Sequence, residues 1–296
     1  MYFNDSTIVF LNGEWKKAND ANASLYNQTL HYGTAVFEGI RSYRTSDGTR
    51  IFKAEEHYER LHFSAKKMHL NLPYSVKDLV QLTYDLLEKN NLSDAYIRPL
   101  VYSDVHMGLT PTPKTNVFLS AWHWEKYLGN KLLRVMTSSY QRPNPKSCHI
   151  EAKVSGHYVN SVLATNEAKM HGYDEALLLD QNGFVAEGPG ANFFFEKNNT
   201  LYTAPLGNIL PGITRATMFE LCSELEIKLV EKHFTPDEVR GADSAFFTGT
   251  AAEVAGIASL DGVNFRKEWD DSLGALLQAK YTRRVAFNEY GNFALV

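Results

Sequence analysis

The sequence has only two cysteines among its 296 residues, Cys148 and Cys222. They lie far apart, with neither a CxxC pair nor a histidine-rich neighbourhood beside them, so the sequence indicates no zinc site and no disulfide framework. Free thiols are typical of a reducing compartment. We therefore expect a cytoplasmic protein that binds no metal.

Long apolar runs are also lacking. No window approaches the roughly 18 apolar residues that suggest a membrane-spanning helix. The N-terminal stretch Met-Tyr-Phe-Asn-Asp-Ser-Thr has neither the positive charge nor the apolar core of a signal peptide. We expect no membrane partner and no cleaved leader.

Neither sign of charge dominates the chain. The formal net charge is -4, and no basic stripe could neutralise a nucleic-acid backbone, so we expect small-molecule substrates and no nucleic acid. Hydrophobic residues make up 44% of the chain, which is enough for a sizeable core. The length allows two domains with a cleft between them.

The first half of the chain mixes helices with strands. Apolar residues spaced three and four apart predict an amphipathic helix over 54–68, with Arg60 near the edge of its apolar stripe. A capping pattern at Ser-Val-Lys-Asp predicts a second helix over 75–90. Aromatic and β-branched residues predict strands over 95–102 and 116–123.

The second half opens after a stretch with glycine and asparagine that predicts a linker. We expect a small α+β domain over 1–125, a linker over 126–133 and a larger domain over 134–296. Strands and helices alternate without the strict order of a doubly wound sheet. Strands are predicted over 132–137, 175–180, 184–187, 192–196 and 200–203, and helices over 160–171, 214–226 and 271–288.

Two short segments could bind a phosphate or a carboxylate. Residues 210–215, Leu-Pro-Gly-Ile-Thr-Arg, lead into a helix whose unpaired amides and dipole attract anions. The alternative is a Pro-Gly turn with Thr214 as an ordinary N-cap. Residues 248–253, Thr-Gly-Thr-Ala-Ala-Glu, offer hydroxyls and amides after a strand, but alone they are equally a tight turn. Neither segment matches the Walker pattern.

Several polar side chains allow both a functional and a structural interpretation. Lys153 has small or apolar neighbours that could desolvate its amine, although most lysines are solvated surface groups. Glu187 could pair with a protonated ring nitrogen or lie on the surface. Arg98 and Arg41 could bind a carboxylate or form structural ion pairs. The tyrosine at 158 could donate a hydrogen bond or fill the core. Five further aromatic residues are most simply core or interface residues, namely Tyr32, Phe37, Tyr96, Trp124 and Tyr127.

Short motifs follow one another along nearly the whole chain, from about Phe10 to the final helix. They are HYGTAVFEGIR at 31–41, RLH at 60–62, AYIRPL at 95–100, MGL at 107–109, YLG at 127–129, AKVSGHY at 152–158, LLLDQNGFVAEG at 177–188, LPGITR at 210–215 and GTAAE at 249–253. Any one is weak, but the ordered set is specific. It resembles the branched-chain aminotransferases of the fold-type-IV pyridoxal-phosphate enzymes.

The resemblance implies a two-domain protein of mixed α+β and α/β class, with the architecture of D-amino-acid aminotransferase and pyridoxal 5'-phosphate in the interdomain cleft. It implies reversible ping-pong transfer of the amino group of L-leucine, L-isoleucine or L-valine to 2-oxoglutarate. A second copy would complete the active site, so the family implies a homodimer or a larger homo-oligomer.

The resemblance also implies roles for residues around the cofactor. Lys153 would carry the cofactor as a Schiff base and move the substrate proton. Tyr158 would bond the cofactor's phenolic oxygen, and Glu187 would keep the pyridine nitrogen protonated. The other cofactor-binding residues, mostly at the phosphate, would be Arg60, Leu210, Gly212, Ile213, Thr214 and Thr250.

Substrate binding follows from the same resemblance. Thr250, Ala251 and Tyr96 would bind the α-carboxylate, and Arg98 would recognise the γ-carboxylate of glutamate. The remaining substrate-binding residues would be Phe37, Gly39, Arg41, Trp124, Tyr127 and Tyr158, joined by Tyr32 and Leu109 from the second copy.

One residue departs from the family pattern, because Ala191 stands where many relatives have glutamate. The same fold also serves D-amino-acid and (R)-amine transaminases and aminodeoxychorismate lyases, and a catalytically silent binding protein is a further alternative. The segment Tyr-Ile-Arg-Pro at 96–99 favours the branched-chain enzymes.

Overall fold

The computed structural model describes residues 2–112, 114–124, 128–129 and 131–287. The chain forms two compact units. The N-terminal unit comprises Met1–Glu125 and Ala152–His157, and the C-terminal unit comprises Lys126–Glu151 and Tyr158–Val296. The domain division with a linker over 126–133 stays a prediction, and part of that linker lies outside the described residues.

The N-terminal unit is built on an antiparallel sheet in the order β2-β1-β7-β6-β4-β5, with β3 beside β6. The two predicted strands are confirmed as β6 and β7, which pair from Tyr96 opposite Trp122 to Ser103 opposite Thr115. The strands are β1 (Ile8–Leu11), β2 (Glu14–Lys17), β3 (Val36–Phe37), β4 (Ile40–Thr45), β5 (Gly48–Ile51), β6 (Ala95–Ser103) and β7 (Thr115–Trp122).

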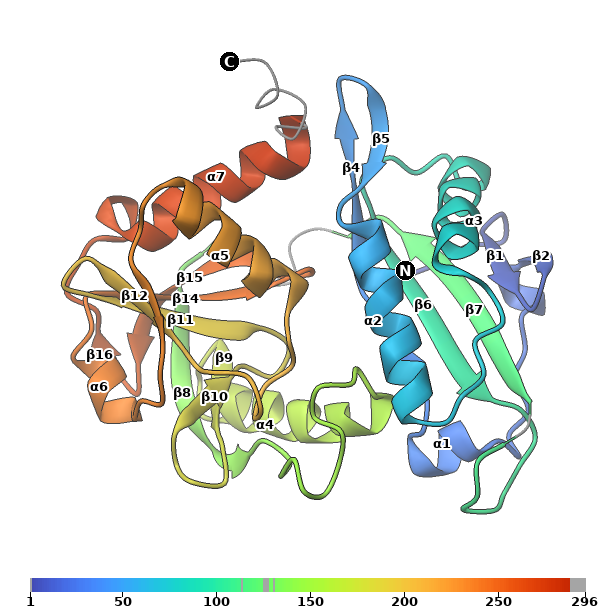
Figure 1. Cartoon of the computed structure of the whole chain (residues 1–296), viewed down its shortest axis with the longest axis horizontal. Helices are drawn as coiled ribbons and strands as arrows, with labels where there is room; N and C mark the ends of the chain where they lie inside the picture. Colours follow the sequence, from blue (N-terminus) through green and yellow to red (C-terminus); the bar gives the residue numbers. More distant parts are fainter. Residues whose placement is uncertain (1, 113, 125–127, 130, 288–296) are drawn as a thin grey trace. The chain divides into compact units, whose positions relative to one another are not determined.

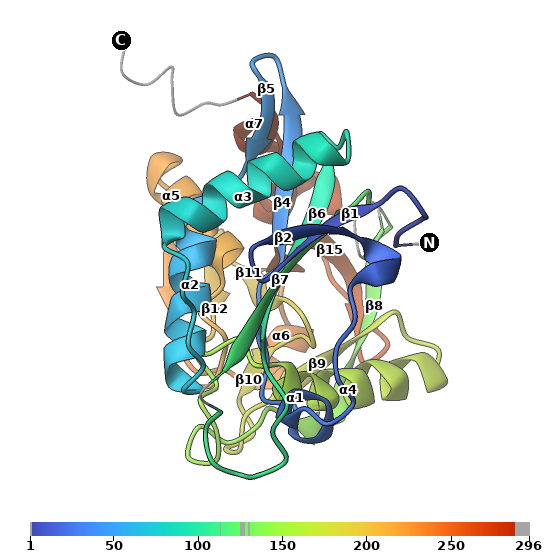
Figure 2. The ribbon, with the colours of Figure 1, turned by 90° about the vertical axis from the view of Figure 1, so that its right-hand side faces the viewer.

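Helices α2 (Ala54–Lys67) and α3 (Val76–Lys89) lie over one face of this sheet (Figure 1). The apolar stripe of α2, with Tyr58 and Leu61, packs on the strands in the main core of the unit. The predicted capping pattern is confirmed, because Ser75 and Asp78 form a reciprocal capping box at the start of α3. The short helix α1 (Gln28–Tyr32) contacts β6, and Figure 2 shows both elements from a second side.

The C-terminal unit holds a mixed sheet in the order β10-β9-β8-β15-β14-β11-β12-β13. An additional pairing of β10 with β11 closes β10, β9, β8, β15, β14 and β11 into a ring. Phenylalanines of β11 and β14 help to fill the core of this unit. The strands are β8 (Leu133–Gln141), β9 (Glu175–Leu179), β10 (Val185–Glu187), β11 (Asn192–Lys197), β12 (Thr200–Thr203), β13 (Leu229–Glu231), β14 (Ser244–Gly249), β15 (Glu253–Leu260) and β16 (Val263–Asn264).

Three long helices pack on this sheet, and all three predicted ranges are confirmed to within two residues. Helix α4 (Tyr158–Met170) packs on β8 and β9, whereas α5 (Ile213–Glu224) and α7 (Leu273–Phe287) pack on each other and on β14 (Figure 1). The short helix α6 (Pro236–Arg240) has its own capping box.

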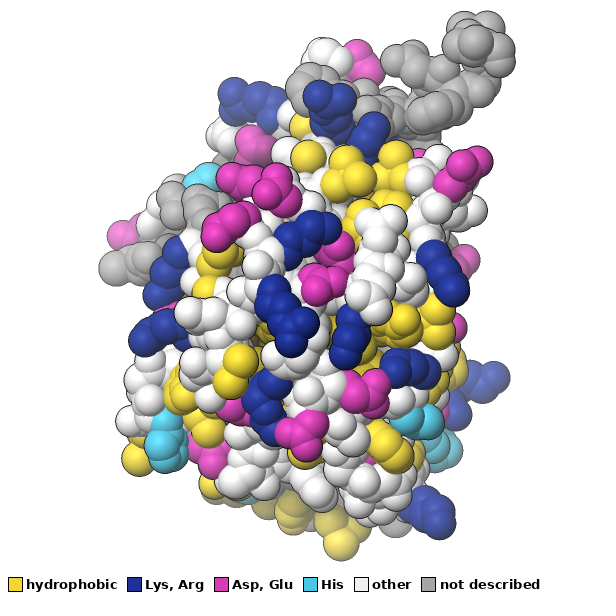
Figure 3. All heavy atoms as spheres, turned by 90° about the vertical axis from the view of Figure 1, so that its left-hand side faces the viewer, with side chains coloured by type: hydrophobic (Ala, Val, Ile, Leu, Met, Phe, Trp, Pro, Cys, Tyr) yellow, Lys and Arg dark blue, Asp and Glu magenta, His cyan; other side chains and the backbone are white. Residues whose placement is uncertain are grey.

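The surface mixes both signs of charge. On the face drawn in Figure 3, Lys and Arg side chains are interspersed with Asp and Glu. No helix within the described ranges is long and apolar enough to cross a bilayer.

Candidate active site

Lys153 is fixed by its backbone in the N-terminal unit. Its N–H donates to the hydroxyl of Ser64 on α2 at 3.0 Å, and its carbonyl accepts the N–H of Phe37 at 3.1 Å. Its neighbours in sequence, Ala152 and Val154, are part of the buried core. The segment that carries Lys153 is therefore anchored to both a helix and a strand, which is the rigid support that a catalytic side chain needs.

The chain passes through a narrow gap just beyond Lys153. Gly156 donates its N–H to the carbonyl of Gly33 at 2.9 Å, and a Cβ on Gly33 would lie 2.8 Å from the Cα of Gly156. Only glycine permits backbones to approach so closely. The two glycines thus hold the Lys153 segment against the end of α1.

The ring of Phe37 is in contact with two cations. The amine of Lys153 is 4.9 Å from the ring centroid, and the guanidinium carbon of Arg98 is 4.7 Å from it. Such distances permit cation–π attraction. Contact with the one ring therefore keeps the amine and the guanidinium within one small region of the unit.

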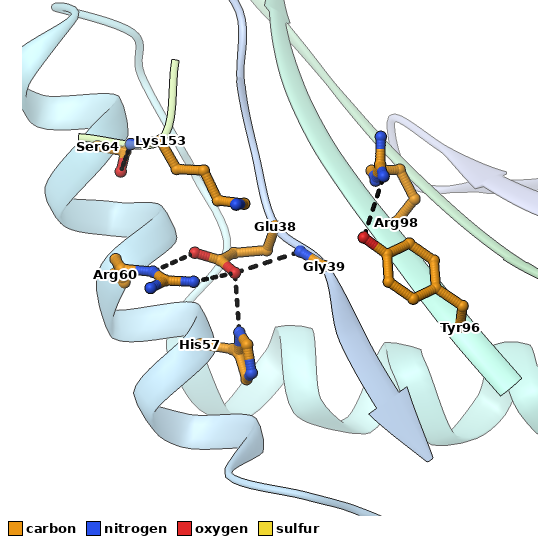
Figure 4. Close-up of polar contacts among 8 residues, drawn as sticks. All are labelled: Glu38, Gly39, His57, Arg60, Ser64, Tyr96, Arg98 and Lys153. Atoms are coloured by element: carbon orange, nitrogen blue, oxygen red, sulfur yellow. Dashed lines mark hydrogen bonds and ion pairs between the residues drawn. The ribbon is translucent and has the colours of Figure 1, made fainter. Parts of the chain in front are cut away.

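Glu38 is fully buried and collects a cluster of donors (Figure 4). Its carboxylate accepts bonds from Arg60 Nε at 2.6 Å and Nη2 at 2.8 Å, from His57 Nδ1 at 2.8 Å and from the N–H of Gly39 at 3.2 Å. Neither Glu38 nor His57 is among the site residues predicted from the sequence. The available signal was the spacing of three between His57 and Arg60, which places both on one face of α2.

The charges of this cluster follow from its partners. Burial alone would raise the pKa of Glu38, but the charge of Arg60 and the bonds from His57 and Arg60 hold this pKa well below its usual range. Burial lowers the pKa of His57, and Glu38 only partly offsets that effect. The cluster is thus an ionised glutamate, an arginine and a neutral histidine.

Strand β6 presents Tyr96 and Arg98 together. Arg98 Nη2 donates to the Tyr96 hydroxyl at 3.0 Å, and Tyr96 packs edge-on against Trp124 at a centroid separation of 4.8 Å. Within the described ranges Arg98 forms no ion pair, and its buried Nε has no hydrogen-bond partner. Among the described residues its contacts are aromatic rings and a phenol, so the structure gives no support there to the interpretation of Arg98 as half of a structural ion pair.

Arg41 and Gly39 shape the same region. Arg41 is buried and donates from Nη1 to the carbonyl of Trp124 at 3.0 Å, which fixes that segment of backbone. Gly39 lies directly against Tyr96. Tyr127, predicted to contact substrate, lies outside the described residues.

Tyr32 and Leu109 lie on an exposed apolar surface of the same unit. Tyr32 is 48% exposed and Leu109 is 84% exposed, so neither is a core residue. The Tyr32 hydroxyl donates to the carbonyl of Met107 at 3.4 Å, and Gln28 Nε2 donates to the carbonyl of Gly108 at 2.7 Å. These bonds tie the loop at 105–110 to α1.

Glu187, at the end of β10 in the C-terminal unit, is buried, so its interpretation as a surface glutamate is wrong. Arg142 Nε lies 3.0 Å from Glu187 Oε1, and both side chains are less than a tenth exposed. Asn192 Nδ2 donates to the carboxylate at 2.9 Å, and the N–H of Leu210 donates at 3.2 Å. Arg142 is not among the predicted site residues, because nothing in its local sequence pattern distinguishes it from a surface arginine.

The predicted anion-binding segment at 210–215 forms the start of α5. Gly212 is the N-cap and no side chain caps the helix, so the interpretation of Thr214 as an ordinary N-cap is wrong. Thr214 is instead a buried residue of the first turn, after Ile213. A Cβ on Gly212 would overlap Asn192 Oδ1, which explains the glycine. The amides at the start of α5 are arranged as in helix N-termini that bind phosphate.

The second predicted anion-binding segment follows β14. Thr248 on β14 lies opposite Asn192 in the sheet, and Asn192 lies opposite Glu187. The hydroxyl of Thr248 is buried without a hydrogen-bond partner in the described part of the chain. Thr250 and Ala251 form the half-buried turn that follows. The C-terminal unit thus gathers Glu187, the start of α5 and this turn around Asn192, while Tyr158 begins α4.

The fold and these two groups of residues agree with one family of proteins. The model of the amino-transferase class IV family matches residues 35–260, and the chain belongs to this family.

Its relatives are more specific. The chain is 44% identical over 261 residues to a branched-chain-amino-acid aminotransferase of Pseudomonas aeruginosa, covering 86% of this chain and 85% of the relative. The structure of the Escherichia coli branched-chain amino acid aminotransferase matches with a TM-score of 0.91 and 36% identity, covering 95% of each chain. That of the Thermobaculum terrenum enzyme in its PLP form matches with a TM-score of 0.89 and 31% identity, covering 95% and 94%. The resemblance predicted from the motifs is confirmed.

Proposed function

We propose that the chain is a pyridoxal-phosphate-dependent branched-chain aminotransferase that exchanges amino groups between L-leucine, L-isoleucine or L-valine and 2-oxoglutarate. The observation that carries the proposal is the pair of cations that both contact the ring of Phe37. An amine that can bind the cofactor, Lys153, lies near the guanidinium of Arg98, which can bind a carboxylate and whose Nε has no hydrogen-bond partner among the described residues. An amino-acid site needs both groups.

The residues fit pyridoxal phosphate. The start of α5, which no side chain caps, and the hydroxyl of Thr248, which has no hydrogen-bond partner in the described ranges, suit its phosphate. The buried carboxylate of Glu187 suits a protonated ring nitrogen, and Lys153 suits its aldehyde. When bound, the cofactor accepts the electrons released as the substrate Cα proton leaves. The cofactor prediction is confirmed at the level of the family, in which the Thermobaculum terrenum relative was solved in its PLP form.

We assign the chemical step to Lys153. Its amine would bind the cofactor's aldehyde. Once released, the amine would act as general acid and base and move the proton between the substrate Cα and the cofactor C4′. Glu187, bound by Arg142 and Asn192, would keep the ring nitrogen protonated. Tyr158 would donate to the phenolic oxygen. Arg60, Leu210, Gly212, Ile213, Thr214 and Thr250 would hold the rest of the cofactor.

Substrate recognition must accept both an apolar and an acidic side chain. Phe37, Trp124 and Tyr158 would supply apolar contacts, and Arg98 would supply the charge that a γ-carboxylate requires. Tyr96, Thr250 and Ala251 would bind the α-carboxylate. Arg41 and Gly39 would fix the shape of this wall, and Tyr127 stays part of the proposed substrate set.

We further propose self-association through the apolar surface around α1. Leu30 is 62% exposed on α1, where Tyr32 is also exposed. Leu109 lies on the loop at 105–110, which is hydrogen-bonded to α1. Contiguous exposed apolar side chains of this kind usually mark an interface. Light scattering should give a homodimer or a larger oligomer, and Leu109→Asp should shift the mass toward the monomer. A wild-type protein with the mass of a monomer would contradict this assignment. The cytoplasmic location stays a prediction.

A half-reaction tests the proposed function. The purified protein with bound pyridoxal phosphate is mixed separately with L-leucine, D-alanine and an (R)-amine, and its visible spectrum is followed. We expect L-leucine alone to convert the absorbance to that of the pyridoxamine phosphate form. Conversion by D-alanine or the amine instead would leave the family assignment intact but contradict the branched-chain substrate. A protein that binds no cofactor would favour a silent binding protein.

A further inference from the structure

Glu38 determines the plane of the Arg60 guanidinium. Two parallel bonds, Nε to Oε1 and Nη2 to Oε2, join the guanidinium edge to a single carboxylate (Figure 4). A paired fork of this kind fixes the rotation of the guanidinium as well as its position. The Glu38 backbone is held in turn, because its N–H donates to the carbonyl of Pro99 at 3.0 Å.

His57 fixes Glu38 itself. Its Nδ1 donates to Oε2, the oxygen that also receives Arg60 Nη2 and the N–H of Gly39. His57 is buried and burial lowers its pKa, so this neutral ring supplies a hydrogen bond without adding a charge. The carboxylate therefore has three kinds of donor that prevent its rotation.

The cluster lies on the face of α2 that also holds the lysine segment. His57, Arg60 and Ser64 are spaced at three and four along the helix, so they share one face. Ser64 anchors the backbone of Lys153. Figure 4 shows the Lys153 side chain extending toward Glu38, and its charge contributes to the lowered pKa of His57. A core ion pair with a purely structural role would not need this proximity to the amine.

We propose that Glu38 and His57 are positioning residues that hold Arg60 in the orientation in which it binds the cofactor phosphate. The inference rests on the proposed function, because it takes Arg60 as a phosphate ligand. Glu38 offsets the charge of Arg60, so the arrangement gives up net attraction for the phosphate. What it gains is a guanidinium that is already oriented before the phosphate arrives.

The test compares two ligands that differ only in the phosphate. Dissociation constants of pyridoxal phosphate and of pyridoxal are measured by absorbance for the full-length apoprotein, together with inorganic phosphate binding by phosphorus NMR. We expect Glu38→Gln to weaken the binding of pyridoxal phosphate and of inorganic phosphate about tenfold or more, which is the effect of losing a hydrogen bond to a charged group. The dissociation constant of pyridoxal should stay within about twofold of the wild-type value, because Glu38→Gln acts only at the phosphate.

The histidine supplies matched variants in case Glu38→Gln folds poorly. His57→Leu removes the donor at similar volume and should act like Glu38→Gln, whereas His57→Asn keeps a donor near Nδ1 and should restore most of the preference for the phosphate. In an Arg60→Gln background, Glu38→Gln should add nothing further.

Three outcomes would overturn the inference. One is an equal loss of pyridoxal and pyridoxal phosphate, which indicates a structural role only, and another is an undiminished effect of Glu38→Gln in the Arg60→Gln background. The third is a wild-type protein that transaminates but prefers pyridoxal phosphate over pyridoxal no more strongly than Arg60→Gln does. That result would remove Arg60 from the phosphate site and leave the proposed function intact. Absence of transamination by the wild type contradicts the proposed function itself.

Discussion

The backbone of Gly39 lies against the phenol of Tyr96, so that a Cβ on Gly39 would overlap the hydroxyl oxygen. Tyr96 is buried and packs on Trp124, so it cannot move aside freely. We expect Gly39→Ala to displace the phenol together with its partner Arg98. Because a shift of about 1 Å in a site can cost roughly 100-fold in rate, kcat/KM should fall by about that factor for leucine and glutamate alike.

Gly39→Ala should also lower the free energy of unfolding by about 1–3 kcal/mol, the usual cost of overpacking. Gly241→Ala is the matched control, since a Cβ there would make only ordinary contacts, the nearest at 3.6 Å. Steady-state kinetics and urea unfolding of both variants measure the effect. Normal kinetics for Gly39→Ala would show that Tyr96 has no part in substrate binding.

Lys153→Ala should abolish transamination while the protein still folds. The backbone contacts of Lys153 with Ser64 and Phe37 do not require its side chain. A lost nucleophile and general base should reduce turnover by at least about 1,000-fold and remove the visible absorbance of the bound cofactor. Lys146→Ala, at an exposed position, serves as the control. Appreciable turnover by Lys153→Ala would exclude this lysine from the mechanism.

Arg98→Gln should separate the acidic substrate from the apolar ones. Loss of a charged bond to the γ-carboxylate should lower kcat/KM for glutamate and 2-oxoglutarate by about 10- to 100-fold, and the value for leucine much less. Arg44→Gln, at an exposed arginine of β4, is the control, because it removes a guanidinium outside the site. Equal losses for glutamate and leucine in Arg98→Gln would count against a γ-carboxylate role.

The longer elements of the fold could be predicted from local sequence. Helices α2, α3, α4, α5 and α7 have enough residues to show an apolar period or a capping pattern, and their predicted limits lie within two residues of the observed ones. Short strands such as β1 and β13 contain too few residues to show alternation. Closure of the C-terminal sheet by β10 and β11 depends on a pairing that no periodic pattern reveals.

The residues of the candidate site divide in a similar way. Lysine and arginine in distinctive motifs, and a glycine before a helix, could be selected from sequence and from family resemblance. Their partners could not be, because Glu38 lies 22 residues from Arg60 and Arg142 is distant in sequence from Glu187. Periodicity describes one element at a time, whereas these buried pairs join different elements.

The buried pair of Arg142 and Glu187 should be costly to break from one side. Arg142→Met leaves the carboxylate buried without its cation, and we expect a loss of about 3–5 kcal/mol in the free energy of unfolding. The double variant Arg142→Met/Glu187→Gln should recover most of that loss, because no buried charge remains, but it should not recover turnover. Urea unfolding measures the first effect and leucine kinetics the second. Additive losses in the double variant would mean that the two side chains do not interact energetically.

Glu175 should make the protein less stable as the pH rises. It is buried, and burial raises its pKa above the usual 4.5, with bonds from the Ala176 N–H and from Thr165 offsetting only part of the effect. The folded state therefore holds the proton more tightly than the unfolded state. Stability is highest below the unfolded pKa and falls until the pH passes the folded pKa. Glu175→Gln removes this dependence, so its stability relative to the wild type should rise across that window.

Asp174 provides a control of opposite sign. Burial would raise its pKa, but bonds from Lys131 and Arg134 hold the pKa well below its usual 3.8. The contribution of Asp174 to stability is fully present above the pKa of the unfolded chain and is lost on acidification. Asp174→Asn should therefore be less stable than the wild type at neutral pH and equally stable in acid. Urea unfolding across an acid-to-neutral series measures both slopes. A Glu175→Gln difference that did not change with pH would show that Glu175 titrates alike in the folded and unfolded chain.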